Sequence, residues 1–297
     1  MASRNKNIFQ HTKAFWGFVA PCMILFSVFF LLPLLLSFSF SFTNYDGWKR
    51  MQFTGLKNYV HLFHDGNFYT SLGRTFIYTL FSLPFKVIIP LILAMLVTNP
   101  KMHAKGAART MIYIPVLLSS LVVGITINWM FGQEYGLINF IISSAGGKPL
   151  EWALNSKLAS FVISFASNWA SAGFYMIIYI GSINNISADL YEASSIDGAT
   201  GIQSFFKITL PLLMPTTFLV VLLSTVNLLK EYALVQGITQ GGPGTTTTFI
   251  IQYIFSRGFD NSEYGYASAI SIIVMLVFIA IAVVQFKLSN GGETDYE

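Results

Sequence analysis

The stretch YEASSIDGATGIQSFFKITLPLLMP, from Tyr191 to Pro215, is the most hydrophilic organised segment of a chain that is otherwise mostly apolar. Hydrophobic residues make up 54% of the 297 residues and charged residues 10%, whereas soluble domains average about 25% charged residues. This composition indicates an integral membrane protein. The quoted stretch is therefore a polar connection between apolar segments. Its residues should indicate the function of that connection.

Apolar runs on both sides of this stretch are long enough to cross a bilayer as helices, which takes about 20 residues. The runs cover 15–42, 72–97, 111–131, 158–183, 210–229 and 266–286. Their apolar residues are continuous instead of alternating over about ten residues, which excludes strands as the spanning element. The sequence predicts an all-α integral membrane protein with six transmembrane helices in a single domain, 1–297.

Basic residues near the ends of the spans indicate the orientation, because cytoplasmic loops carry an excess of Lys and Arg. The totals on the two sides are equal, but Lys101, Lys105 and Arg109 crowd one short turn that contains no acid. We therefore expect a multi-pass protein of the cell membrane with both terminal tails, 1–14 and 287–297, in the cytoplasm. Basic flanks also account for the net charge of +4, so no nucleic-acid partner is expected.

Capping signals divide the quoted region into two helices. Ser187 is a suitable N-cap, and Asp189 in the first turn favours the positive end of the helix dipole. The helix should stop at Asp197-Gly198, because glycine readily adopts the left-handed conformation that ends helices. Thr200 and Gln203 have the spacing of a capping box. A second helix should therefore begin at once and lead into the fifth span.

The first of these two helices has a flat side. Ala193, Ser194 and Ser195 provide almost no side-chain bulk, and Glu192 contributes a single protruding carboxylate. Such a helix can enter a groove on another protein. Spacing alone is equally consistent with an amphipathic connector that lies on the bilayer.

The same region resembles the cytoplasmic EAA loop of the permease subunits of binding-protein-dependent ABC importers. In that pattern Glu-Ala-Ala is followed three residues later by Asp-Gly-Ala, then by Phe, Ile and Leu-Pro. The matching residues are Glu192, Ala193, Asp197, Gly198, Ala199, Phe205, Ile208, Leu210 and Pro211. Ser194 stands where the second alanine is expected and is nearly as small. Two further segments, 113–139 and 239–255 with 264–271, are similar to parts of the maltose-type carbohydrate branch.

The resemblance implies a type I ABC importer permease fold with a core at 71–286 and a coupling loop at 187–209. The loop would dock on a cytoplasmic ATPase through Glu192, Ala193, Ser194, Asp197, Gly198 and Ala199. The implied partners are two ABC ATPase subunits, a second permease subunit that is expected to be a different chain, an extracytoplasmic solute-binding protein and a carbohydrate substrate. The chain itself would catalyse no covalent chemistry.

The sequence supports this division of labour independently, because it has no phosphate-binding loop. Its one Gly-Lys pair, Gly147-Lys148, is followed by Pro149 and not by Ser or Thr. ATP and Mg are therefore expected in a partner ATPase, and no cofactor is expected in this chain. The four histidines are scattered, and His61 with His64 is more typical of a loop than of a metal site.

Polar residues inside the spans suggest where a sugar would pass, because such groups are costly unless they face the bundle interior or a wet cavity. They form one stripe in the fourth span and a second in the fifth. The candidates for the substrate path are Asn168, Trp169, Ser171, Tyr175, Ser224, Asn227 and Glu231. Trp169 and Tyr175 offer rings for the apolar face of a sugar. Serines in such positions also bond their own helix or hold neighbouring helices together.

Other functions remain open at this point. Lys86 lies in the middle of the second span, where its stem could also snorkel to the interface. An ion-gradient-driven secondary transporter would use Lys86, Lys230 and Glu231 as a relay, but this reading leaves the coupling loop unexplained. A scaffold without a substrate leaves the polar stripes unexplained. A permease for a solute other than a sugar is a further alternative, and the sequence does not name the sugar.

Overall fold

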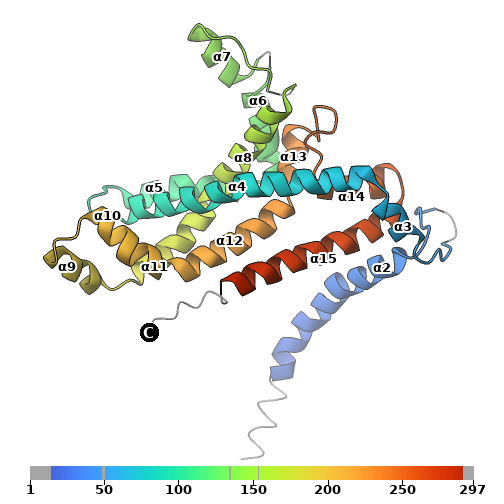
Figure 1. Cartoon of the computed structure of the whole chain (residues 1–297), viewed down its shortest axis with the longest axis horizontal. Coiled ribbons are helices and arrows are strands. Elements are labelled where there is room, and N and C mark those ends of the chain that lie inside the picture. The colour runs from blue at the N-terminus through green and yellow to red at the C-terminus, as the bar shows by residue number, and fades with distance from the viewer. Residues whose placement is uncertain (1–14, 49–50, 134, 153, 290–297) are drawn as a thin grey trace, which may run out of the picture. The chain divides into compact units, whose positions relative to one another are not determined.

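The computed structural model describes residues 15–48, 51–133, 135–152 and 154–289 (Figure 1). These residues are predominantly helical, and a single β-bridge pairs Thr43 with Phe53. The predicted all-α class is confirmed. Four helices are long and apolar enough to cross a membrane: Phe15–Phe40, whose last part is α2 (Leu32–Phe40), α4 (Gly66–Thr98), α8 (Ser156–Asn184) and α15 (Tyr264–Leu288).

The predicted third span is a bent pair of helices. α5 (Lys105–Tyr113) continues through a 3₁₀ turn, Ile114–Leu117, and α6 (Ser120–Met130) then leaves at an angle of 98°. The prediction of one helix over 111–131 is therefore wrong. Pro115 lies in the 3₁₀ turn, and Leu118 is extended with φ −82° and ψ 144°. Proline at this point removes an amide donor, which explains why the apolar run does not continue as one helix.

The predicted fifth span is also bent. α10 (Gly201–Ser204) continues through a π-helical turn, Phe205–Thr209, into α11 (Leu210–Leu212). α12 (Met214–Leu229) then follows at an angle of 66°. One continuous helix over 210–229 is therefore also a wrong prediction, because prolines stand in the first turns of both α11 and α12. Among the described residues, the number of segments long and apolar enough to cross a membrane rises from four to six when each bent pair counts as one span.

Short helices that the sequence did not predict lie in the connections between the spans. They are α3 (Lys57–Phe63), α7 (Leu137–Ser144), α13 (Ala233–Ile238) and α14 (Ile250–Phe255), which ends in a π-helical turn, Ser256–Asp260. α9 (Ala188–Ile196) precedes α10 in the quoted region, as predicted. All of these helices are too short to cross a bilayer.

The chain divides into two compact units, one of which contains the residues up to Asp65 together with Ile254–Met275. In this unit a Cβ placed on Gly265 would lie 2.1 Å from the carbonyl oxygen of Thr43. The hydroxyl of Tyr266 donates to the carboxylate of Asp65 at 2.6 Å. The glycine and the second tyrosine of the 264–271 motif therefore hold this unit together.

The other unit contains Gly66–Tyr253 and Leu276–Glu297, and it holds the candidate sites. Within it α4 packs along α8 and also contacts α12 (Figure 1). One buried apolar cluster surrounds Ile163 and Val235, and a second surrounds Met176 and Leu213. Together the two clusters hold α4, α8 and α12 in register and fix the cavities between them.

Close helix contacts occur where α6 meets α13. A Cβ on Gly124 would lie 2.9 Å from the Cα of Gly237, and a Cβ on Gly237 would lie 2.8 Å from the Cα of Gly124. Small residues are typical of membrane helix crossings because they let backbones approach closely. The loop after α13 is anchored to α4, since the amide of Ile250 donates to the Thr75 hydroxyl at 2.9 Å and the Arg74 guanidinium donates to the Thr245 carbonyl.

Candidate functional site

The predicted coupling loop, 187–209, has the local structure that its capping residues predict. The Ser187 hydroxyl accepts from the amide of Asp189 at 3.3 Å, and α9 ends before Asp197. Gly198 follows with φ +75°, which an L side chain rarely adopts. Thr200 and Gln203 then form the capping box: the amide of Gln203 donates to the Thr200 hydroxyl at 3.3 Å, and the amide of Thr200 donates to Gln203 Oε1 at 2.8 Å.

Side-chain hydrogen bonds fasten α9 to the segment that follows it. The Ser194 hydroxyl donates to the carbonyl of Tyr191 at 2.9 Å and is hydrogen-bonded to the Ser204 hydroxyl at 3.1 Å. The hydroxyls of Tyr191 and Thr209 are 2.9 Å apart. Ser194, the one departure from the expected Glu-Ala-Ala pattern, therefore forms an internal contact of the loop.

A groove of about 860 Å³ runs between this loop and the C-terminal ends of α4 and α8. Three of the predicted coupling residues line it, namely Glu192, Ser194 and Ala199. The other three, Ala193, Asp197 and Gly198, are exposed. The six residues thus form one small region, with part of it facing a groove and part facing outwards.

Two exposed isoleucines flank the glycine turn and were not among the predicted residues. Ile196 is 86% exposed and Ile202 is 73% exposed. Each is an apolar side chain among polar neighbours, which is the signal in the sequence that could have identified it. Exposed apolar groups that gather on a polar connection are typical of a surface that another protein covers.

A cavity of about 630 Å³, open on one side, lies between α4, α8, α12, the start of α13 and the segment around Pro115. Four of the seven predicted path residues line it: Ser171, Tyr175, Asn227 and Glu231. Two residues that were not among the predicted ones, Phe174 and Tyr232, add aromatic rings to the wall of this cavity. Hydroxyl, amide and carboxylate groups beside aromatic rings are the chemistry that binds a polar organic ligand.

Lys86 belongs to this cavity and does not snorkel. It is 1% exposed, and its ammonium donates to Asn227 Oδ1 at 2.7 Å. Glu231 is 9% exposed and accepts from the Ser167 hydroxyl at 3.4 Å and from the amide of Leu234 at 3.3 Å. The interior of α4 and the end of α12 thus bring a buried cation and a buried anion to one wall.

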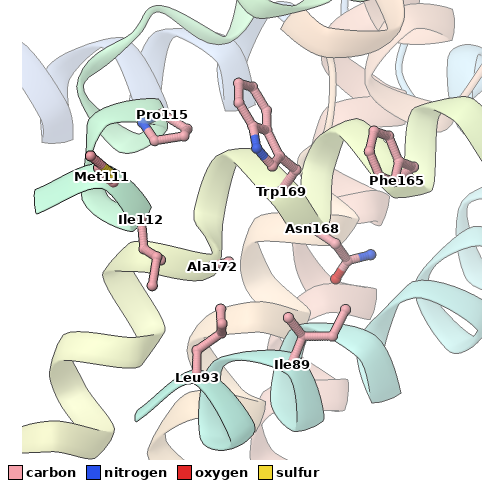
Figure 2. Close-up of a pocket in the computed structure, with 9 residues that line it drawn as sticks. All are labelled: Ile89, Leu93, Met111, Ile112, Pro115, Phe165, Asn168, Trp169 and Ala172. Carbon is pink, nitrogen blue, oxygen red and sulfur yellow. The ribbon is translucent and has the colours of Figure 1, made fainter. Parts of the chain in front are cut away.

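The remaining path candidates lie elsewhere. Asn168 and Trp169 line a second cavity, of about 360 Å³, whose walls are mostly apolar and include Ile89 and Leu93 (Figure 2). Figure 2 shows the Asn168 amide and the Trp169 ring projecting in different directions from α8. Ser224 is fully buried. The structure therefore does not bring these three residues to the larger cavity.

Part of the polar stripe on α8 holds helices together. The Ser82 hydroxyl of α4 donates to the Ser164 hydroxyl of α8 at 2.7 Å, and the Ser171 hydroxyl donates to the carbonyl of Ser167 at 2.7 Å. The stripe therefore divides into a side that bonds α4 and a side that faces the larger cavity. Within the described ranges, no group of three or more His, Cys, Asp or Glu residues is arranged to hold a metal ion.

Comparison with known proteins identifies the family. Residues 59–290 match the family described as binding-protein-dependent transport system inner membrane component. The chain belongs to this family. The permease is therefore a multi-pass membrane protein, and its relatives are transport subunits.

Two relatives match the permease over nearly its full length. It is 31% identical to the arabinooligosaccharides transport system permease protein AraP of Bacillus subtilis, over 96% of this chain and 92% of AraP. It is 32% identical to the lactose transport system permease protein LacF of Rhizobium radiobacter, over 91% of this chain and 92% of LacF.

A solved structure of similar fold is a chain of a bacterial ABC transporter involved in the import of the acidic polysaccharide alginate. The TM-score is 0.84 at 22% identity, over 97% of the permease and 98% of that chain. The predicted fold of an ABC importer permease is confirmed.

Proposed function

We propose that this permease forms half of the translocation pathway of an ATP-driven importer for a sugar or an oligosaccharide. The observation that carries the proposal is the 630 Å³ cavity, in which Ser171, Asn227 and Glu231 stand beside the rings of Phe174 and Tyr175. Relatives such as AraP and LacF are named as permeases for arabinooligosaccharides and lactose. Both observations favour a saccharide as the solute.

The coupling loop is the proposed contact with the ATPase. Its docking surface comprises Glu192, Ala193, Asp197, Gly198 and Ala199, with Ser194 holding α9 in place, and the exposed Ile196 and Ile202 extend it. The chain runs from α9 through the glycine turn, α10 and α11 to α12, so a displacement of the loop is transmitted along the chain to the helix that carries Asn227. This continuity is a mechanical route from the ATPase to the cavity.

The partners of the proposal are those that membership of the family implies. A second permease subunit, expected to be a different chain, completes the pathway, and a solute-binding protein delivers the sugar. ATP and Mg bind two cytoplasmic ATPase subunits, and no cofactor belongs to this chain. In this proposal both termini lie in the cytoplasm. With six spans, the loop between the fourth and fifth spans then lies on the same side.

Uptake experiments test the energy source. Cells without other importers for the sugar would express the permease with its neighbouring subunits and be given a labelled oligosaccharide. Depletion of ATP with the ion gradient intact should stop uptake, and collapse of the gradient with ATP intact should not. Uptake that follows the gradient would instead establish a secondary transporter.

Cysteine labelling tests the orientation. Cys22 is the one cysteine of the sequence. In a Cys22→Ser background, Ser195→Cys and Gly244→Cys should react with thiol reagents from opposite sides of the membrane. In intact cells an impermeant reagent should label the variant at position 244 and spare the variant at position 195. Labelling of both would overturn the six-span topology.

A further inference from the structure

Two opposite charges lie in the wall of the 630 Å³ cavity and come from different parts of the chain. Lys86 lies on α4, and Glu231 lies just beyond the end of α12. Both side chains are at least nine-tenths buried, and they interact electrostatically. Isolated charges are expensive inside a membrane protein, so a pair of this kind indicates a function.

The two charged groups have different hydrogen-bond partners. Lys86 donates to Asn227, whereas Glu231 accepts from Ser167 and from the amide of Leu234. An ammonium has three donors and a carboxylate about four acceptor positions, so both retain capacity for a guest in the cavity. A brace between helices would be expected to join the two charges directly, because buried ion pairs repay their desolvation only with excellent mutual geometry.

We propose that Lys86 and Glu231 form a charge-balanced recognition pair that makes this cavity select neutral saccharides over acidic ones. The inference rests on the proposed function of sugar import. A sugar hydroxyl both donates and accepts, so neighbouring hydroxyls satisfy the carboxylate and the ammonium together. An acidic sugar loses its hydration on entry, and the repulsion from Glu231 offsets the attraction to Lys86.

The predicted consequence is a change in selectivity when the balance is removed. Glu231→Gln leaves the cation of Lys86 uncompensated, so an acidic saccharide should gain affinity relative to a neutral one by roughly tenfold or more, which corresponds to about 1.4 kcal/mol. Lys86→Gln leaves the anion of Glu231 and should shift the same ratio in the opposite direction. The double variant should return towards the wild-type ratio.

Binding to the purified complex in lipid nanodiscs measures this ratio. The neutral probes are arabinotriose, lactose and maltotriose, and the acidic probe is trigalacturonate. Lys157→Gln is the matched control, because Lys157 is an exposed lysine of the same compact unit and is not among the residues that line this cavity. It should leave the ratio unchanged. Thermal unfolding of each assembled variant separates a change in recognition from a loss of structure, and Lys86→Gln carries the test alone if Glu231→Gln does not assemble.

Each outcome has a defined meaning. An unchanged ratio in both single variants overturns the recognition pair. An equal shift in Lys157→Gln shows that the general positive field of the protein acts, and the assignment to the buried pair then fails. Failure of the wild-type complex to bind any neutral probe counts against the proposed sugar function. If the wild-type complex binds neutral and acidic probes with equal affinity, the recognition pair is ruled out and the proposed sugar function is not.

Discussion

The coupling loop and the 630 Å³ cavity lie in the same compact unit. Contacts between near neighbours in the sequence determine the loop, whereas contacts between distant residues determine the cavity. The loop is built from neighbours in the chain: the hydrogen bonds of its caps join residues two or three positions apart. The cavity depends on distant pairs, of which Lys86 and Asn227 are 141 positions apart. Substitutions in the loop should therefore change coupling, whereas substitutions in the cavity should change recognition or packing.

The largest expected effect is at the glycine turn of the loop. Gly198→Val places a β-branched residue at φ +75°, so the turn between α9 and α10 should not form as it does now. Uptake and saccharide-stimulated ATP hydrolysis should be lost, while the amount of permease in the membrane stays unchanged.

The matched control lies three positions away in the same loop. Gly201 has no positive φ, and a Cβ there meets nothing within 4 Å. Gly201→Ala should therefore transport normally. Wild-type uptake by Gly198→Val at equal membrane levels would remove the loop from the coupling mechanism.

The next effect is in the cavity. Asn227→Leu removes the acceptor of the Lys86 ammonium and leaves a buried cation without it, at a cost of roughly 1–3 kcal/mol. The apparent affinity for the saccharide should fall by roughly one to two powers of ten, with ATPase docking intact. Binding assays on the assembled complex measure this.

Val221→Leu on the same helix is the control, because Val221 is only half buried and is not among the residues that line the cavity. It should have almost no effect. If Asn227→Leu instead lowers the thermal stability of the subunit and leaves binding unchanged, Asn227 holds helices together and the path lies elsewhere.

A smaller effect is expected at the exposed isoleucines. Ile196→Ser removes an apolar side chain that is 86% exposed, so the subunit alone should lose no stability. Association with the ATPase should weaken by roughly tenfold, about 1.4 kcal/mol, which is near the lower end of the roughly 1.5–3 kcal/mol that fully burying such a side chain contributes. Co-purification in mild detergent, followed by titration of the ATPase, measures the change. Unaltered association would place Ile196 outside the interface.

The contrast between the two regions also explains what the sequence could predict. Ser187, Gly198 and Thr200 act on their own neighbours, so the ends of both loop helices follow from them. Continuous apolar runs indicated six spans, but they did not show the bends at Leu118 and Leu213, because the prolines that break the helices there leave the apolar runs uninterrupted. Predicting which residues line the cavity requires knowing which helix faces contact one another. The sequence alone does not distinguish the side of α8 that carries Asn168 from the side that carries Ser171.

The smallest expected effect tests whether the loop is as locally determined as its hydrogen bonds suggest. Ser194→Ala removes the bond to the Ser204 hydroxyl and introduces the alanine that the Glu-Ala-Ala pattern has at this position. The lost bond costs about 0.5–1.5 kcal/mol, but the better helix propensity of alanine, about 0.5 kcal/mol, offsets part of it. Uptake should therefore stay within about twofold of wild type, since Tyr191 and Thr209 still join the two segments. A large loss of coupling without a loss of protein would show that the Ser194–Ser204 contact sets the angle of α9, and the loop would then depend on contacts beyond its caps, as the cavity does.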